Sequence, residues 1–525
     1  MEHDISEIDL ILTNIVGGNG FAQWKIIFFG FILNVGGSAP LLIHMFAAHA
    51  PDHRCEVPIC EGTPGDWMSF ALPERSGASS FLKPMEKYDS CSAYRVLDPN
   101  GACVPENFDS DVIDSCSDWV YDKKDYEYTL ATKYNLVCEN ESKNRLLGSL
   151  MMMGLMFGSL IGGKISDRFG RKKACFLSIA AIAPTITLAG FIPSFTVYAV
   201  LRLITCTCIP IQWVGAKSLL IEVFGLKGRE KCVAVKDTFA PIYIAYLGLL
   251  AYFIRQYEYL HLAVGLTCLL SLSTWFFIPE SMRWDIANNK KENAMHTLRS
   301  IAKWNRRELT QEHIEYMEDT LSKIQAENAK LNNEGRFQIW DMFRKEYRVI
   351  SLILIFNWIT VCVTGYTLTL NVTSLSGDIF VNFIISGLAE LPASLVIYFL
   401  LKYLGRRPNL FIYQLTTVIA FIILGVISKS LSTLVLIVFL VGKAAAGAAF
   451  EIAWLLPMEL YPTNLRSQAV GTCSTISRLF GMTTSFIGAL AFYWQPLPLI
   501  VIGVPALIAG LLAFCLPETK GKGLP

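Results

Sequence analysis

Charged side chains inside long apolar runs are the residues of this sequence best suited to bind a charged small molecule. Glu390, Lys443, Glu451 and Arg478 each interrupt such a run, as does Lys217. An ionisable side chain within a membrane span is costly, so each marks a candidate functional site. Arginine can hold a carboxylate through two parallel hydrogen bonds. The set therefore predicts a binding site for an organic ion.

Each of these residues also has a structural interpretation. Arg478 would form an internal salt bridge to Glu451 or Glu390. Lys217 would extend toward the cytoplasm or pair with Glu222, and this interpretation is slightly favoured. Glu390 is expected to act mainly as a structural hydrogen-bond partner.

A combined site for a zwitterion follows from the spacing of these charges. Lys443 and Glu451 are eight residues apart, and helical periodicity places them close to one face. Arg478 would hold the carboxylate of a zwitterion, and Glu451 would hold its ammonium. If Arg478 and Glu451 instead neutralise each other, aromatic rings would make most of the substrate contact, because ring faces attract quaternary ammonium groups. The candidate wall residues are Trp213, Phe239, Tyr243, Tyr246, Trp358, Tyr366, Phe450 and Trp454.

A second candidate site is a gate built from charged loop motifs. Asp167 can accept hydrogen bonds from a helix N-terminus, and Arg168 and Arg171 can pair with acids at neighbouring helix ends. Such a cluster would hold one side of the protein closed and would open it when two halves move against each other. The alternative is a static loop. The predicted gating residues are Gly163, Asp167, Arg168, Gly170, Arg171, Glu222, Arg229, Gly405, Arg406, Glu459 and Arg466.

The elements that position these residues are predicted membrane helices. Of the 525 residues, 53% are apolar and 17% are charged, and the mean hydropathy is +0.42. A span needs about 20 apolar residues. The apolar runs lie at 24–48, 145–163, 174–193, 196–221, 233–254, 259–279, 349–371, 378–402, 409–428, 431–456, 467–492 and 496–516.

Three signatures recur and indicate two homologous halves. Gly170 and Gly405, in Gly-Arg motifs, are 235 residues apart, and the Glu-x6-Arg motifs that begin at Glu222 and Glu459 are 237 apart. The Pro-Glu pairs at 279–280 and 517–518 are 238 apart. We therefore predict an all-α membrane protein with twelve transmembrane helices in two parallel six-helix halves and a substrate site between them.

Charge and cysteine placement predict the orientation. Short basic connections after the second, fourth and eighth spans favour a cytoplasmic side that also holds both termini. The polar insert at 50–143 has 18 acidic and 9 basic residues and would be extracellular. We predict segments 1–23 (cytoplasmic), 24–279 (first half), 280–347 (a partly helical cytoplasmic linker, with a flexible solvated linker as the alternative), 348–517 (second half) and 518–525 (cytoplasmic).

Six of the 14 cysteines lie in the insert and predict three disulfides in an oxidising space. Their pairing is open among 15 combinations. A zinc site is the alternative, but the insert lacks a C-x2-C pair, and we predict no metal site. The six residues are Cys55, Cys60, Cys91, Cys103, Cys116 and Cys138.

The sequence resembles the major facilitator superfamily, and within it the organic cation, anion and carnitine transporters of solute carrier family 22. The resemblance covers nearly the whole chain and includes the segments at 51–55, 134–138, 166–172, 279–284, 377–382 and 459–463. It implies that Arg478 stands where anion and carnitine carriers have arginine and cation carriers have an acid. Lys443 also matches the anion and carnitine carriers, whereas Glu451 matches the cation carriers. Lys217 departs from the aromatic residues usual at its position.

The leading function is a plasma-membrane transporter of organic anions or zwitterions such as carnitine-like compounds. The alternatives are a polyspecific organic cation carrier that uses Glu451 and, third, a polytopic enzyme or a non-transporting scaffold. No nucleotide-binding motif or catalytic cluster is present, so we predict no enzyme activity and no cofactor. The coupling ion, sodium or proton, stays open. A net charge of +1 gives no argument for nucleic-acid binding, and the expected partners are the substrate and the bilayer, with no protein partner identified.

Overall fold

The chain forms two compact units in the computed structural model. It describes residues 7–64, 66–74, 88–225, 228, 231–232, 235–236, 238–331, 339–372, 375, 377–427, 431–461, 463–494 and 496–518. The bundle unit comprises residues 1–42, 148–252 and 261–525, and the cysteine-rich unit comprises residues 43–147 and 253–260.

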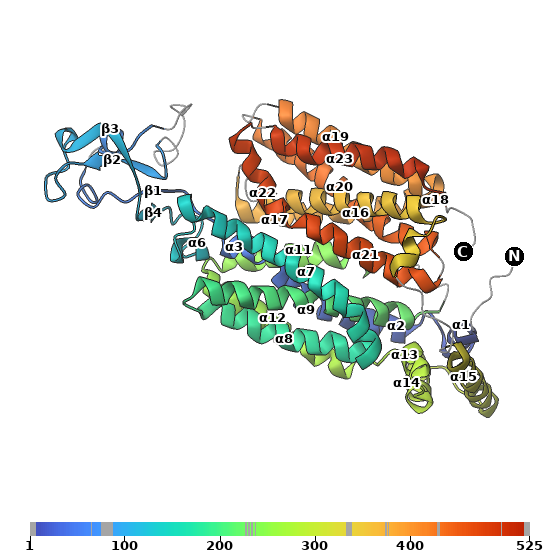
Figure 1. The fold of residues 1–525 in the computed structure, drawn as a ribbon. Helices are drawn as coiled ribbons and strands as arrows, with labels where there is room; N and C mark the ends of the chain where they lie inside the picture. The colour runs from blue at the N-terminus through green and yellow to red at the C-terminus, as the bar shows by residue number, and fades with distance from the viewer. Residues whose placement is uncertain are drawn as a thin grey trace. The chain divides into compact units, whose positions relative to one another are not determined.

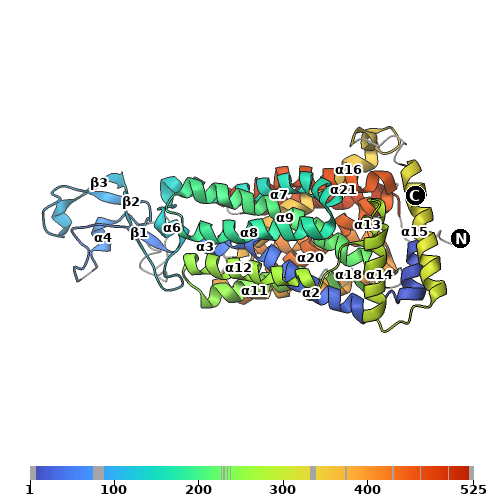
Figure 2. The ribbon, with the colours of Figure 1, turned by 90° about the horizontal axis from the view of Figure 1, so that it is seen from below.

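Long apolar helices make up most of the bundle unit (Figures 1 and 2). Within the described ranges, nine are long and apolar enough to cross a membrane, and two shorter apolar helices accompany them. The first half contains α2 (Phe21–Ser38), η2 (Ala39–Leu42), α7 (Glu141–Phe169), α8 (Arg171–Phe191), α9 (Phe195–Glu222), α11 (Phe239–Phe253), α12 (Tyr257–Ser271) and η5 (Leu272–Phe276). The second half contains α16 (Arg348–Leu370), α17 (Ile379–Leu388), α18 (Glu390–Leu404), α19 (Arg406–Val426), α20 (Ser432–Leu460), α21 (Thr463–Gly481), α22 (Thr484–Ile487), η8 (Gly488–Phe492), α23 (Leu497–Leu512) and η9 (Ala513–Cys515).

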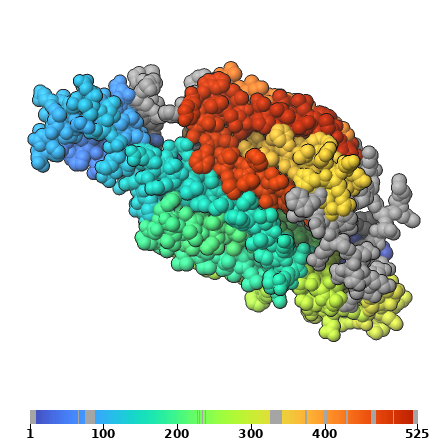
Figure 3. All heavy atoms as spheres, viewed as in Figure 1, coloured from blue at the N-terminus to red at the C-terminus, as the bar shows by residue number. Residues whose placement is uncertain are grey.

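These helices confirm the predicted fold class, but some predicted spans are interrupted. The run at 378–402 is divided between α17 and α18. Pro392 lies in the first turn of α18, where the missing N–H of proline would have no helical partner in any case. The break places Glu390 at the start of α18 rather than in the middle of a continuous helix. In Figure 3 the green first half and the orange-red second half meet along the length of the bundle.

The segment between the halves contains α13 (Met282–Ala287), α14 (Lys291–Trp304), α15 (Gln311–Leu331) and η6 (Ile339–Phe343). Helices α13, α14 and α15 lie beyond one end of the bundle in both ribbon views. Met317 and Leu321 lie one helical turn apart on α15, and both are fully buried. They share a core with the N-terminal α1 (Glu7–Leu10) and η1 (Ile11–Val16). One face of α15 is thus buried against the N-terminal segment, as expected for an amphipathic helix.

The cysteine-rich unit is built on two small antiparallel sheets. Strand β1 (His53–Cys55) pairs with β4 (Trp119–Tyr121), and β2 (Ser92–Val96) pairs with β3 (Phe108–Ser115). The short helices are α3 (His44–Ala47), α4 (Met68–Ala71), η3 (Pro105–Asn107), α6 (Leu130–Lys133) and η4 (Cys138–Asn140). A small apolar core that includes Trp67 and two disulfide pairs holds the sheets.

Candidate functional site

A cavity of about 170 Å³ lies among the helices of the bundle unit. Its charged lining residues are Glu390, Lys443 and Glu451, and its aromatic lining residues are Tyr243, Tyr366 and Phe450. Helices from both halves contribute to this lining. The cavity therefore offers both signs of charge and aromatic walls to a ligand.

Lys443 and Glu390 form an ion pair in the cavity wall. The distance from Lys443 Nζ to Glu390 Oε1 is 3.1 Å, and the two side chains are 2% and 21% exposed. The ammonium also donates a 2.6 Å hydrogen bond to the Ser386 hydroxyl. Glu390 therefore pairs with Lys443 and not with Arg478, which was one of the alternatives. Glu451 lines the same cavity, as its eight-residue spacing from Lys443 predicted.

Arg478 is buried at a contact between the two halves. Its Nη1 donates to the hydroxyl of Ser474 on its own helix, α21, and to the hydroxyl of Ser159 on α7. These partners are hydroxyl groups and not Glu390, which pairs with Lys443. Arg478 lies in the neighbourhood of Tyr366, which lines the cavity. The guanidinium is thus held by hydroxyl groups near the cavity.

Lys217 contacts an aromatic ring of the other half. Its Nζ lies 4.8 Å from the centroid of Trp454, although Lys217 belongs to α9 and Trp454 to α20. Glu222, its proposed partner, instead accepts hydrogen bonds from Arg171 and Ser281. Lys217 is absent from the cavity lining.

The predicted aromatic wall is only partly assembled around the cavity. Tyr243, Tyr366 and Phe450 line it. The indole N–H of Trp213 instead donates a 2.7 Å hydrogen bond to the Ser38 hydroxyl. The hydroxyl oxygen of Tyr246 lies 2.7 Å from that of Thr267. Trp358 is 1% exposed and packs against Trp454 in an apolar core.

Sequence reasoning missed the small residues that make space for the cavity. Ala444, Ala446, Gly447 and Ala448 line it along α20. Their signal was visible in the sequence as an unbroken run of alanine and glycine between Lys443 and Phe450. Ser159, which binds Arg478, gave no such signal.

The predicted gating residues form a similar arrangement in each half. In the first half, Arg171 Nη1 lies 2.8 Å from Asp167 Oδ1, and Arg171 Nε lies 3.4 Å from Glu222. In the second half, Arg406 binds both carboxylate oxygens of Glu459, with a shortest distance of 2.7 Å. Each arginine therefore binds an acid of its own half.

Two predictions in this region differ from the structure. Arg168, expected to pair with an acid, lies 5.7 Å from the Phe169 ring and forms no ion pair within the described residues. The helix N-terminus is bound by Glu280 rather than Asp167, because Glu280 accepts a 2.9 Å hydrogen bond from the Lys172 backbone N–H. Glu518 does the same in the second half, from the backbone N–H groups of Arg406 and Arg407. Arg229 and the side chain of Arg466 lie outside the described residues.

The glycines beside these carboxylates are required by backbone geometry. Gly170 has φ +106° and Gly405 has φ +91°, which side chains disfavour. A Cβ on Gly170 would lie 2.5 Å from Glu280 Oε2, and one on Gly405 would lie 3.0 Å from Glu518 Oε1. Gly163 differs, because a Cβ there would meet no described atom within 4 Å. Among the described residues, nothing therefore requires a glycine at position 163.

We expect Gly170→Ala to lower the apparent melting temperature and the transport rate, because it strains the backbone and displaces Glu280 from the helix N-terminus. The backbone cost alone is about 1–3 kcal/mol. Gly163→Ala is the matched control and should be neutral or slightly stabilising, because alanine is the better helix former. Thermal unfolding of the purified proteins in detergent measures both changes. Equal melting temperatures for the two variants would contradict the assigned role of Gly170.

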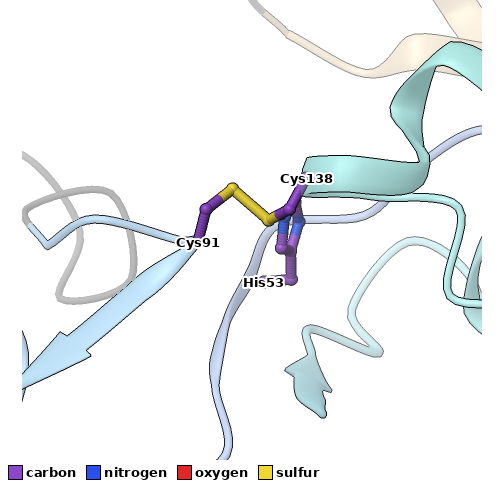
Figure 4. Close-up of side chains that lie close together, drawn as sticks. All are labelled: His53, Cys91 and Cys138. Carbon is purple, nitrogen blue, oxygen red and sulfur yellow. A yellow bond between two sulfur atoms is a disulfide. The ribbon is translucent and has the colours of Figure 1, made fainter. Parts of the chain in front are cut away.

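The six cysteines of the insert form three disulfides in the cysteine-rich unit. The pairs are Cys55–Cys116, Cys60–Cys103 and Cys91–Cys138. His53 lies beside the third pair, with Nε2 3.9 Å from Cys138 Sγ (Figure 4). Because both sulfur atoms are in the disulfide, they have no thiolate to offer a metal at this cluster. In the same unit, hydrogen bonds from Arg54 lower the pKa of the Glu61 carboxyl.

Comparisons with known proteins agree with this architecture. The family described as "Sugar (and other) transporter" matches residues 106–525. The human "Organic cation/carnitine transporter 2" is 30% identical over 500 residues, which cover 92% of this chain and 86% of the relative. The Drosophila melanogaster "Organic cation transporter-like protein" is 29% identical over a match that covers 95% of this chain and 88% of the relative. The xylose transporter of E. coli, in a partially occluded inward-open conformation, has a TM-score of 0.62 at 14% identity, over 94% of this chain and 100% of its own. This likeness supports the fold alone.

Proposed function

Because this chain belongs to the major facilitator superfamily, within its solute carrier family 22 of organic cation, anion and carnitine transporters, we propose that it carries organic anions or zwitterions of the carnitine-like class. The mechanism is alternating access between two halves of the bundle. The observation that carries the substrate class is the burial of Arg478 with hydroxyl partners, close to the cavity residue Tyr366.

A buried guanidinium gains most from an anion, since hydroxyl groups leave its positive charge uncompensated. Ser159 lies on the first half and Ser474 on the second, so movement of the halves would alter this coordination. A substrate carboxylate can then take the place of a hydroxyl. Glu451 lines the cavity, and we assign it to a substrate ammonium because its carboxylate has the opposite charge. Arg478 and Glu451 would thus bind the carboxylate and the ammonium of a zwitterion.

A carrier for organic cations is the alternative, and one observation favours it. Glu451 lines the cavity directly, whereas Arg478 is absent from the lining. The names of the relatives include organic cation as well as carnitine transporters. In this alternative Arg478 has a structural role between the halves.

The membrane placement is part of the proposal. The protein is assigned to the plasma membrane, with both termini and α13–α15 on the cytoplasmic side and the cysteine-rich unit outside. The basic short loops and the disulfides support this orientation. The coupling ion is left unassigned.

Radiotracer uptake in cells that express the protein tests the substrate class. Carnitine, tetraethylammonium and a dicarboxylate are compared with and without sodium, and we expect carnitine or the dicarboxylate to be taken up. Glu451→Gln should selectively reduce uptake of substrates that carry an ammonium group, because it removes their counter-charge. Surface biotinylation controls for expression. Uptake of tetraethylammonium alone would overturn the zwitterion assignment and favour the alternative, while equal loss of all substrates in Glu451→Gln would indicate a structural role for Glu451.

A further inference from the structure

The contact between Lys217 and Trp454 lies just beyond one end of the cavity. The cavity residues of α20 extend from Lys443 to Glu451, and Trp454 follows Glu451 by about one helical turn, toward Glu459. Lys217 is five residues before Glu222 on α9. The pair is therefore located between the cavity and the end of the bundle where Glu222 and Glu459 bind their arginines.

An aromatic cluster connects the cavity wall to this contact. Phe450 lines the cavity, and its ring centroid lies 6.3 Å from those of both Trp358 and Trp454. The Trp358 and Trp454 centroids are 4.7 Å apart. Trp358 is 1% exposed, which fixes the cluster in the core of the second half. The first half contributes the Lys217 ammonium to the free end of this cluster.

The chemistry of the contact is the same as that of a substrate ammonium on an aromatic ring. A cation within about 6 Å of a tryptophan face is attracted by the ring quadrupole, and the attraction is stronger in a desolvated site. A primary ammonium on a lysine and a quaternary ammonium on a substrate compete for the same face. A carboxylate has no attraction for it.

We propose that Lys217 closes the cavity at this end by binding the Trp454 ring, and that the ammonium group of a passing substrate opens the gate by replacing the Lys217 ammonium. The inference rests on the proposed function, because it requires a transported substrate. It adds a selectivity step, since a substrate with an ammonium group speeds the opening of the gate, whereas an organic anion passes only when the contact between Lys217 and Trp454 opens by itself. Lys217 is thus an internal competitor of the substrate rather than its binding partner.

A cysteine reporter in the cavity tests the gate. Gly447 lines the cavity, and a Cβ there would make ordinary contacts of 3.6–3.9 Å with Glu390, so Gly447→Cys should be tolerated. An anionic, membrane-impermeant methanethiosulfonate is applied to inside-out vesicles and, in parallel, to intact cells. Other cysteines are present and can also react with the reagent. The background is therefore measured in proteins that keep Gly447, and it is subtracted from the labelling of the Gly447→Cys proteins.

The Gly447→Cys protein is the parent for the variants of Lys217 and Trp454. In inside-out vesicles, we expect the reagent to label the introduced cysteine about tenfold faster when Lys217→Met is added to the parent. Adding Lys217→Arg should leave the labelling rate at that of the parent, because arginine keeps the cation. Trp454→Leu should behave like Lys217→Met, and Trp454→Phe should be intermediate. Tetramethylammonium should accelerate labelling in the parent and leave Lys217→Met unchanged. Lys290→Met, which removes a 4.2 Å cation–π contact to Trp284 in the linker, is the matched control and should leave labelling unchanged.

Equal labelling of the parent and Lys217→Met would overturn the gate. Slower labelling of the parent with tetramethylammonium would overturn displacement by the substrate. Wild-type uptake separates these results from the proposed function: uptake of carnitine with no effect of Lys217→Met refutes the gate alone, whereas absence of uptake for every substrate refutes the function. Surface expression and melting temperature of each variant exclude misfolding as the cause.

Discussion

Arg478→Ala is expected to raise the KM for substrates that carry a carboxylate by about thirtyfold, while the protein still reaches the cell surface. A hydrogen bond to a charged group contributes about 1.5–3 kcal/mol, and 1.4 kcal/mol corresponds to a factor of ten. Arg478 is only 5% exposed, so water would replace the lost contact poorly. The KM is measured by concentration-dependent uptake of carnitine and of a dicarboxylate.

Two further variants distinguish substrate binding from structural support. Arg478→Lys keeps the charge but loses the planar fork, so its KM should lie between those of the wild type and Arg478→Ala. Ser159→Ala removes a hydroxyl partner on the first half and leaves the guanidinium in place. If all three variants lost surface expression equally, Arg478 would be a structural residue. Unchanged uptake by Arg478→Ala would refute its role in substrate binding.

Lys443→Met is expected to destabilise the protein by about 3–5 kcal/mol, because it leaves Glu390 without its partner in a largely buried site. The double variant Lys443→Met/Glu390→Gln should recover most of the loss, since no isolated charge is then buried. Thermal unfolding in detergent measures this coupling. Lys323→Met is the control, because its ion pair with Asp319 is more than half exposed and contributes about 0–1 kcal/mol.

The rescue is the decisive comparison in this series. If the double variant were as unstable as Lys443→Met, the loss would come from packing around the lysine rather than from an unpaired carboxylate. If Lys443→Met were as stable as the wild type, the ion pair would contribute nothing measurable. Transport by the double variant also tests whether the pair is needed for substrate binding or only for stability.

Sequence reasoning predicted the scaffold well because membrane spans, repeats and cysteine clusters are local signals. The duplicated Pro-Glu motifs revealed the repeat, yet the function of Glu280 and Glu518 was missed. Each glutamate binds a helix N-terminus more than 100 residues away in sequence. The spacing of residues in a single sequence does not show which distant segments come into contact.

The candidate site was harder to predict for the same reason. Lys443 and Glu451 share one helix, so their common cavity follows from periodicity. The pairing of Lys443 with Glu390 depends on how α18 and α20 pack, and that of Arg478 with Ser159 depends on a contact between halves. The disulfide pattern is equally a property of the folded chain, since the cysteine spacings alone allowed 15 combinations.

The two ion pairs of the predicted gating residues affect how the halves of the bundle can move. Arg171 binds Glu222 within the first half, and Arg406 binds Glu459 within the second. A rigid-body rotation of one half against the other can leave both pairs intact. In the alternating access proposed above, we therefore expect each pair to move together with its own half.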